Sequence, residues 1–293
     1  MNSNILKRNK NEILKLSVIQ KLSILSLDVV LGSLAGGFFV VKLFNVYPDF
    51  VWWIILPVSV WIVYTLDHLI DAFKLKNKGH TTRHLFHFYY SSQIIIVLIL
   101  LTIINLLLIG FYLEKQIIYF GFIAGGFAVV YLLFVYFVKN KKTVFLQKEF
   151  FVALIYTVGI WGGPAALLGY NLNSTQIVFL IVFFLIAFAD ILIFSLYEEK
   201  TDRIDKHNSF AVNYGSKLTT DLIYILITVA FVLCIYEIIF ESRVEFIFAS
   251  KIFMLMGLIQ LVIMSYPAKF KKNDLYRFIG EMVFWLPWLA LLF

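Results

Sequence analysis

Long apolar segments separated by short polar ones are the most regular feature of this chain. Nine windows of about twenty mostly apolar residues can be drawn, which is the length that an α-helix needs to cross a bilayer. These windows are 22–44, 50–67, 89–111, 116–138, 145–169, 175–197, 218–240, 246–265 and 274–293. No low-complexity linker or break in composition divides them. We therefore expect an all-α, polytopic membrane protein with one nine-helix domain over 22–293.

The composition supports this prediction and argues against a soluble domain, a disulfide or thiolate metal site, and nucleic-acid binding. Hydrophobic residues make up 61% of the 293 positions, with 31 Phe, which is incompatible with an ordinary soluble domain. The single Cys234 excludes an internal disulfide and suggests no thiolate metal site. The net charge of +7 does not indicate nucleic-acid binding, because the cations lie between apolar segments and are typical of membrane orientation.

The distribution of Lys and Arg predicts the orientation of the chain. If the segments between windows alternate between the two membrane faces, one face receives only four of the 25 cations, namely Lys42, Lys115, Arg243 and Lys251. The other face receives all the rest, including the basic segment 1–21. Cytoplasmic segments are enriched in Lys and Arg. We therefore expect a cytoplasmic N-terminus in the cell (inner) membrane, with the first window retained as a helix rather than cleaved as a signal peptide.

Two acidic clusters stand where apolar windows end. The first is Asp67 and Asp71 in LDHLIDAFK, and the second is Glu198, Asp202 and Asp205 in YEEKTDRIDKH. In both, carboxylates four residues apart would share one face of a helix. We expect the polar segments after the second and sixth windows to carry these clusters. Carboxylates beside lipid are costly and mark functional sites by default.

The chemistry that these clusters favour is the binding of a phosphorylated lipid. Mg²⁺ prefers carboxylate oxygens combined with phosphate, and bound ions would make a diphosphate a better leaving group. Nearby Lys and Arg would hold the remaining phosphate oxygens. The candidates are Lys74, Arg83, Lys148, Arg203 and Lys206. For several loop lysines, Lys74 among them, simple solvation is the favoured interpretation, because the enrichment of Lys and Arg at one membrane face explains them.

A short internal similarity relates the two clusters. VYTLDHLIDAFK and FSLYEEKTDRID align Asp67 with Glu198 and Asp71 with Asp202, and four windows separate them. This favours two related four-helix halves, each contributing an acidic rim to a shared central cavity.

The second cluster also carries a family resemblance. EEKTDRIDKHNSFAVNYG resembles the second aspartate-rich motif of the UbiA superfamily of intramembrane prenyltransferases, which reads roughly D-x-x-x-D-R-x-x-G-x-x-T-L-A-V-x-L-G in its menaquinone-type form. Glu198, Asp202 and Arg203 stand at its acidic and basic positions. Asp67 and Asp71 resemble the first motif, TTRHLFHF the basic stretch after it, and the helix from Lys148 through Gly162-Gly163-Pro164 the corresponding family helix.

The resemblance implies a nine-helix bundle around a cavity, Mg²⁺-dependent diphosphate binding at the cytoplasmic face and a lateral opening for the isoprenoid tail. The main departures from the motifs concern four residues. Val63 and Tyr64 replace the usual Asn-Asp pair, Glu198 replaces Asp, and Lys206 replaces Gly. The metal and diphosphate roles tolerate these changes, whereas the acceptor is left open.

Three acidic residues inside apolar windows are further candidates for function. Asp190 precedes Glu198 by eight residues and so lies about two turns deeper on nearly the same helix face. It is a candidate base or acceptor ligand, with a structural polar pair as the alternative. Asp28 and Glu281 are similar but nearer the window ends. His80, His84 and His87 would allow a zinc site, which the absence of nearby Cys disfavours.

Together these observations predict a UbiA-like prenyltransferase that moves a prenyl group from an isoprenoid diphosphate to an aromatic or lipid acceptor, with Mg²⁺ as cofactor and the lipid bilayer as its environment. The predicted metal ligands are Asp67, Asp71, Glu198 and Asp202. The predicted catalytic residues are Asp71, Asp202 and Asp190, and the predicted diphosphate ligands are Arg83, Lys148, Arg203 and Lys206. Alternatives are a membrane terpene synthase using the same site, a non-catalytic isoprenoid-diphosphate binder and a transporter. The prenyl chain length and the oligomeric state stay open.

Overall fold

The computed structural model of the protein describes residues 18–75, 81–137, 148–205 and 208–292. Within these ranges the structure is all-helical and contains no strand. The longer helices are α3 (Leu27–Phe44), α4 (Trp52–Leu75), α6 (Ser91–Tyr112), α7 (Lys115–Phe137), α8 (Lys148–Leu167), α9 (Ser174–Asp205), α11 (Ser216–Phe240) and α12 (Val244–Ser265). Shorter elements are α2 (Val18–Ile24), α5 (Thr82–Tyr89), α10 (Phe210–Tyr214), α13 (Pro267–Lys271), α14 (Leu275–Val283) and two 3₁₀ segments, η3 (Lys272–Asp274) and η4 (Leu286–Leu292).

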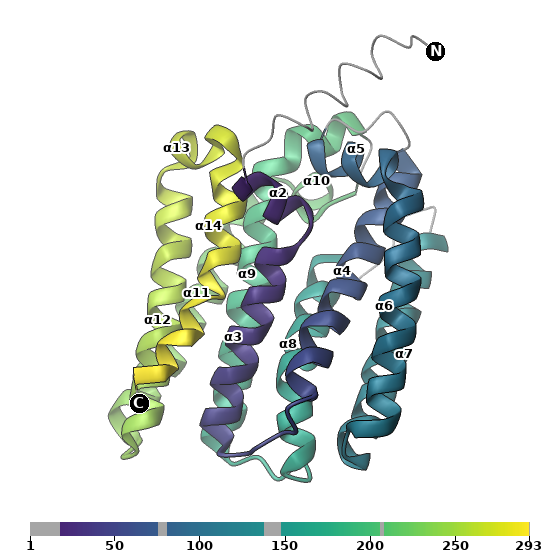
Figure 1. Cartoon of the computed structure of the whole chain (residues 1–293). Helices are drawn as coiled ribbons and strands as arrows, with labels where there is room; N and C mark the ends of the chain where they lie inside the picture. The colour runs from purple at the N-terminus through teal and green to yellow at the C-terminus, as the bar shows by residue number, and fades with distance from the viewer. Residues whose placement is uncertain (1–17, 76–80, 138–147, 206–207, 293) are drawn as a thin grey trace, which may run out of the picture.

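The prediction of nine membrane spans is confirmed for the described part of the chain. Nine segments there are long and apolar enough to cross a bilayer, and each overlaps one predicted window. The all-α fold class and the multi-pass architecture follow directly. An odd number of spans places α2 and the C-terminal end of the described chain at opposite ends of the bundle, as Figure 1 shows.

The acidic clusters lie on helices, as their spacing of four residues predicts, but these helices extend beyond the predicted windows into the segments expected to be polar connections. Helix α4 continues through Asp71 to Leu75, and α9 continues to Asp205. The helical spacing of polar side chains supports this continuation: Arg203 donates to Glu199, one turn earlier, at 2.8 Å. The carboxylates are therefore held on rigid helical turns.

The last span also differs, because it is not one continuous helix. Asn273 and Asp274 adopt left-handed backbone conformations with φ of 55° and 54°, and they separate α13 from α14. Beyond Val283 the chain tightens into the 3₁₀ segment η4, which contains Pro287. The first span is interrupted in the same way at Ser26, where φ is 56°.

The bundle is organised around α9. This helix packs against α8, α10, α11, α12 and α14, and it provides many of the most deeply buried side chains, such as Phe179, Phe183 and Leu192. By contrast α6 has little buried surface and lies at one edge of the bundle (Figure 1). The short helices α5, α10 and α13 gather at the same end as the C-terminal turns of α4 and α9 (Figure 1).

Close helix packing depends on glycine around Trp52. Its indole is 3% exposed and lies between α3 and α8. A Cβ at Gly37 would lie 3.1 Å from the Trp52 ring, and a Cβ at Gly163 would lie 2.8 Å from its Nε1 atom. Only glycine leaves room for the ring on both sides, so these positions fix the separation of α3, α4 and α8.

We expect Gly163→Val to lower the free energy of unfolding by about 1–3 kcal/mol, the usual cost of overpacking a buried contact. Gly110→Val is the matched control, because a Cβ at Gly110 meets nothing within 4 Å. Thermal unfolding in detergent micelles measures both variants. Equal stability of the two would show that Trp52 can move away from α8.

Candidate functional site

A cavity of about 1270 Å³ lies inside the bundle between α4, α7, α8, α9 and α14. Ligand sites for small molecules usually measure about 300–1,000 Å³, so this one has room for a ligand with a long tail. Its walls divide into a charged end and an apolar end. The charged end includes Asp67, Asp71, Arg83, Lys148, Glu198, Asp202 and Arg277. The apolar end includes Trp52, Leu56, Leu113, Ile117 and Phe120.

On one side of the charged end, α4 and α8 bring two carboxylates to one ammonium group. Lys148, the first residue of α8, places its Nζ atom 2.8 Å from Asp67 Oδ2 and 2.6 Å from Asp71 Oδ2. Asp71 is buried, with a relative exposure of 5%. Since buried carboxylates are costly without a partner charge, Lys148 stabilises both of them here.

On the opposite side, α9 and α14 form a second charged cluster around Glu198. Its Oε1 atom accepts hydrogen bonds from Tyr276, at 2.7 Å, and from the Arg277 guanidinium, with which it also forms an ion pair. The Tyr276 ring stacks on Tyr197 with centroids 4.5 Å apart, and Arg277 lies over the Phe194 ring. The Glu198 carboxylate is therefore fixed by contacts with the last span.

Arg83 is carried by α5 and lines the same end of the cavity. Thr81 caps this helix by accepting from the His84 backbone at 3.3 Å. The Arg83 guanidinium donates to the Ser23 carbonyl at 3.1 Å and lies 3.2 Å from His68 Nε2. Burial, assisted by repulsion from Arg277, lowers the pKa of Arg83 to about 10, so it stays charged at neutral pH.

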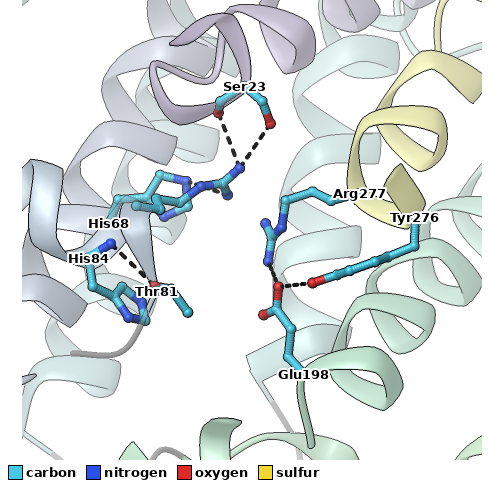
Figure 2. Close-up of polar contacts among 8 residues, drawn as sticks. Ser23, His68, Thr81, His84, Glu198, Tyr276 and Arg277 are labelled. Atoms are coloured by element: carbon cyan, nitrogen blue, oxygen red, sulfur yellow. Dashed lines mark hydrogen bonds and ion pairs between the residues drawn. The ribbon is translucent and has the colours of Figure 1, made fainter. Parts of the chain in front are cut away.

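Figure 2 shows how these groups face one another. Glu198, Tyr276 and Arg277 lie on one side of an open space, and Ser23, His68, Thr81 and His84 lie on the other. His68 lines the cavity and orients Arg83.

The residues that follow the second cluster shape this end of the cavity. The Phe210 backbone N–H donates to Glu149 Oε1 at 2.5 Å, and the Ala211 N–H donates to Ser195 Oγ at 3.0 Å. These side chains satisfy the free N–H groups at the start of α10. The SFAVNYG segment is therefore tied to α8 and α9 beside the carboxylates.

The structure brings most of the predicted site residues together. Asp67, Asp71, Glu198, Asp202, Asp190, Arg83 and Lys148 all line the one cavity. Arg203 does not: it bonds to Glu199 on the same helix, and its side chain is 54% exposed. The geometry therefore does not support Arg203 as a diphosphate ligand. Lys206 lies outside the described residues.

Sequence reasoning missed the role of Arg277 and Tyr276. Arg277 was counted only among the Lys and Arg residues of one membrane face, and Tyr276 carried no prediction. The one available signal is that Arg277 is followed by Glu281 four residues later, the spacing of a single helix face. Their contact with Glu198 joins residues 78 and 79 positions apart, which no local pattern reveals.

The donor set fits Mg²⁺ bound together with a phosphorylated ligand. No three His, Cys, Asp or Glu side chains gather into a metal cage anywhere in the described ranges. Mg²⁺ does not need such a cage, since it is usually held by one or two carboxylates, waters and substrate phosphates. Two carboxylate pairs on separate walls of one cavity match that requirement.

We expect Lys148→Met to lower the melting temperature in the absence of divalent ions, because it removes the cation between Asp67 and Asp71. Added Mg²⁺ should then raise the melting temperature more in this variant than in the parent protein. Lys251→Met, at an exposed position on α12, is the control. An unchanged response to Mg²⁺ would contradict the idea that Lys148 and the metal share these carboxylates.

Comparison with known proteins identifies the fold. No protein-family model and no curated protein matches the sequence. Among solved structures, a UbiA homolog from Archaeoglobus fulgidus, bound to DMAPP and Mg²⁺, superposes with a TM-score of 0.63 at 12% sequence identity. The match covers 92% of this chain and 97% of that one. The chain therefore has the fold of a UbiA homolog.

Proposed function

We propose that this protein is a divergent member of the UbiA superfamily that transfers a prenyl group from an isoprenoid diphosphate to a hydrophobic acceptor. One observation carries this proposal. Two acidic pairs and the cations Arg83, Lys148 and Arg277 line one end of a cavity whose other end is apolar. An isoprenoid diphosphate has the same division into a charged head and an apolar tail. The A. fulgidus homolog of the same fold supports the proposal because it binds such a diphosphate with Mg²⁺.

In this proposal the diphosphate head occupies the charged end of the cavity. Asp67, Asp71, Glu198 and Asp202 would hold Mg²⁺, which would neutralise the diphosphate and improve it as a leaving group. Arg83 and Arg277 are placed to bind phosphate oxygens through their guanidinium groups, which suit bidentate contacts. Lys148 would supply a further charge when it leaves the carboxylates of α4.

The reacting carbon of the donor would lie just below the charged end. Its bond to oxygen breaks and the electron pair leaves with the diphosphate, while an acceptor atom forms the new bond to that carbon. Tyr64, Tyr156 and Phe194 line this part of the cavity, where aromatic faces would stabilise positive charge and exclude water. Asp190, buried on α9, is the candidate to accept the proton that the acceptor loses.

We further propose that the charged end faces the cytoplasm in the cell membrane. The strong excess of Lys and Arg in the segments at that end supports this orientation.

Diphosphate release is the direct test of this function. Purified protein is given dimethylallyl, geranyl or geranylgeranyl diphosphate with Mg²⁺ and a membrane-lipid extract. We expect release that requires Mg²⁺ and that falls roughly 100-fold or more in Asp71→Asn and Asp202→Asn, the loss typical when a site loses one electrostatic contact to developing charge. Asp221→Asn, on the exposed face of α11, should behave as the parent.

The products separate the alternatives. A prenylated lipid identified by mass spectrometry supports transfer and names the acceptor, whereas a cyclised hydrocarbon formed without acceptor indicates a terpene synthase. Donor binding without diphosphate release, whichever acceptor is present, would indicate a non-catalytic binder. The absence of both donor binding and diphosphate release would refute the proposal.

The shape of the cavity predicts an effect on donor length. Gly159 lines the cavity about 16 Å along α8 from Lys148, and a Cβ there meets nothing within 4 Å. We expect Gly159→Leu to project into the tail region and to weaken binding of geranylgeranyl diphosphate while leaving dimethylallyl diphosphate unaffected. Competition binding measures the ratio, with Gly110→Leu as the control outside the cavity. A parallel loss for both donors would show that the tail does not pass Gly159.

A further inference from the structure

A second polar region lies below the charged end and consists of three buried carboxylates. Asp28 on α3, Asp190 on α9 and Glu281 on α14 have relative exposures of 2%, 2% and 9%. Asp190 and Glu281 line the cavity, whereas Asp28 does not. We call these three residues the inner carboxylates.

Packing between α3, α9 and α14 brings the inner carboxylates together. The Trp285 indole donates to the Asp28 carbonyl at 2.9 Å, which joins the start of α3 to the turn after Glu281. A Cβ added at Gly280 would lie 2.8 Å from Asp190 Oδ1, so this carboxylate rests against the backbone beside Glu281. Glu281 follows Gly280 directly on α14, so its backbone lies beside the Asp190 carboxylate.

The inner carboxylates have few internal partners. Within the described part of the chain, the Asp190 carboxylate accepts only one long contact, from Gln260 Nε2 at 3.5 Å. The Glu281 carboxylate makes no hydrogen bond and no ion pair with any described residue, and the Asp28 Oδ2 atom is buried without a donor among the described residues. The Tyr156 hydroxyl, in a side chain only 6% exposed, is similarly unbonded within the described ranges and lies near Gly32, one turn after Asp28.

Unsatisfied polar groups at this depth are unfavourable unless a ligand bonds to them. The groups on offer are carboxylate oxygens and a phenol hydroxyl, so a ligand that donates hydrogen bonds would satisfy them. A carboxylate or phosphate on the ligand would instead be repelled, because like charges brought together are strongly disfavoured. The chemistry of the region therefore selects an uncharged head group that carries hydroxyls.

The depth of the inner carboxylates matches the place where an acceptor must meet the donor. Glu281 lies one turn beyond Arg277, about 6 Å further along α14, and Asp190 lies about 12 Å along α9 from Glu198. A ligand head held there would sit directly beneath a diphosphate bound by Arg277 and Glu198, beside the donor's reacting carbon.

We propose that Asp190 and Glu281, backed by Asp28, form the binding site for the acceptor's head group, and that they select an uncharged, hydroxyl-bearing acceptor over an anionic one. This inference rests on the proposed prenyl transfer, and it names the class of acceptor for that reaction. Tyr156 contributes a hydroxyl to the same site.

Binding of matched probes to the full-length protein in nanodiscs tests this inference. One pair is monooleoylglycerol and its phosphate, and the other is naphthol and hydroxynaphthoate. Each is measured with Mg²⁺ and an unreactive thiolo-diphosphate analogue of geranyl diphosphate, with empty nanodiscs subtracted. We expect the uncharged member of at least one pair to bind about tenfold or more tightly than its anionic partner, the effect of one hydrogen bond to a charged group.

Variants connect the preference to these residues. Asp190→Asn combined with Glu281→Gln should reduce the ratio within that pair to near one while binding of the donor analogue is retained. Glu237→Gln is the matched control, because Glu237 is also a buried carboxylate but does not line the cavity. It should keep the parent ratio.

Each remaining outcome overturns the inference. Anionic probes that bind as tightly as uncharged ones in the parent protein refute it without reference to any variant. So does an uncharged preference that survives in the double variant. Failure of the donor analogue to bind the parent protein is a distinct result. It refutes the proposed function itself, and the acceptor site that rests on this function is then refuted as well.

Discussion

The structure depends on how carboxylates are accommodated inside a bundle of apolar helices. A charge in such surroundings is costly unless another charge or a hydrogen bond offsets it. At the outer level the chain supplies these partners itself: Lys148 lies between Asp67 and Asp71, and Arg277 pairs with Glu198. Each contact joins one carboxylate helix to a different helix, so the ion pairs also determine how α4, α8, α9 and α14 surround the cavity.

The helix α9 connects this charged end to the interior. It is the most extensively packed of the described helices, and it carries Asp190, Ser195, Glu198 and Asp202 on successive turns. Ser195 holds the start of α10, Glu198 is bonded to α14, and Asp190 contacts Gln260 of α12. The same rigid element thus places polar groups at the level of a diphosphate and at the level of an acceptor, which is the preorganisation that transfer between two bound molecules needs.

The cavity itself results from small residues and interrupted helices. Gly37 and Gly163 allow Trp52 to fill the space between α3 and α8, which closes one end. The break at Asn273 and Asp274 turns the chain so that α14 descends beside α9 and presents Tyr276, Arg277 and Glu281 to the interior. A single straight helix over the last window would carry these residues in a different register.

The sequence by itself determined the all-α class, the nine spans and the two acidic pairs, because apolar length and the spacing of four residues are local properties that one segment contains in full. The eight-residue spacing from Glu198 also predicted how deep Asp190 lies on α9. Local spacing did not show that helix α4 continues past Asp71, that Arg203 turns toward Glu199, or that Arg277 is the partner of Glu198. Those facts, and the convergence of Asp28, Asp190 and Glu281, were decided only by the tertiary structure, since they depend on which faces of helices distant in sequence pack together.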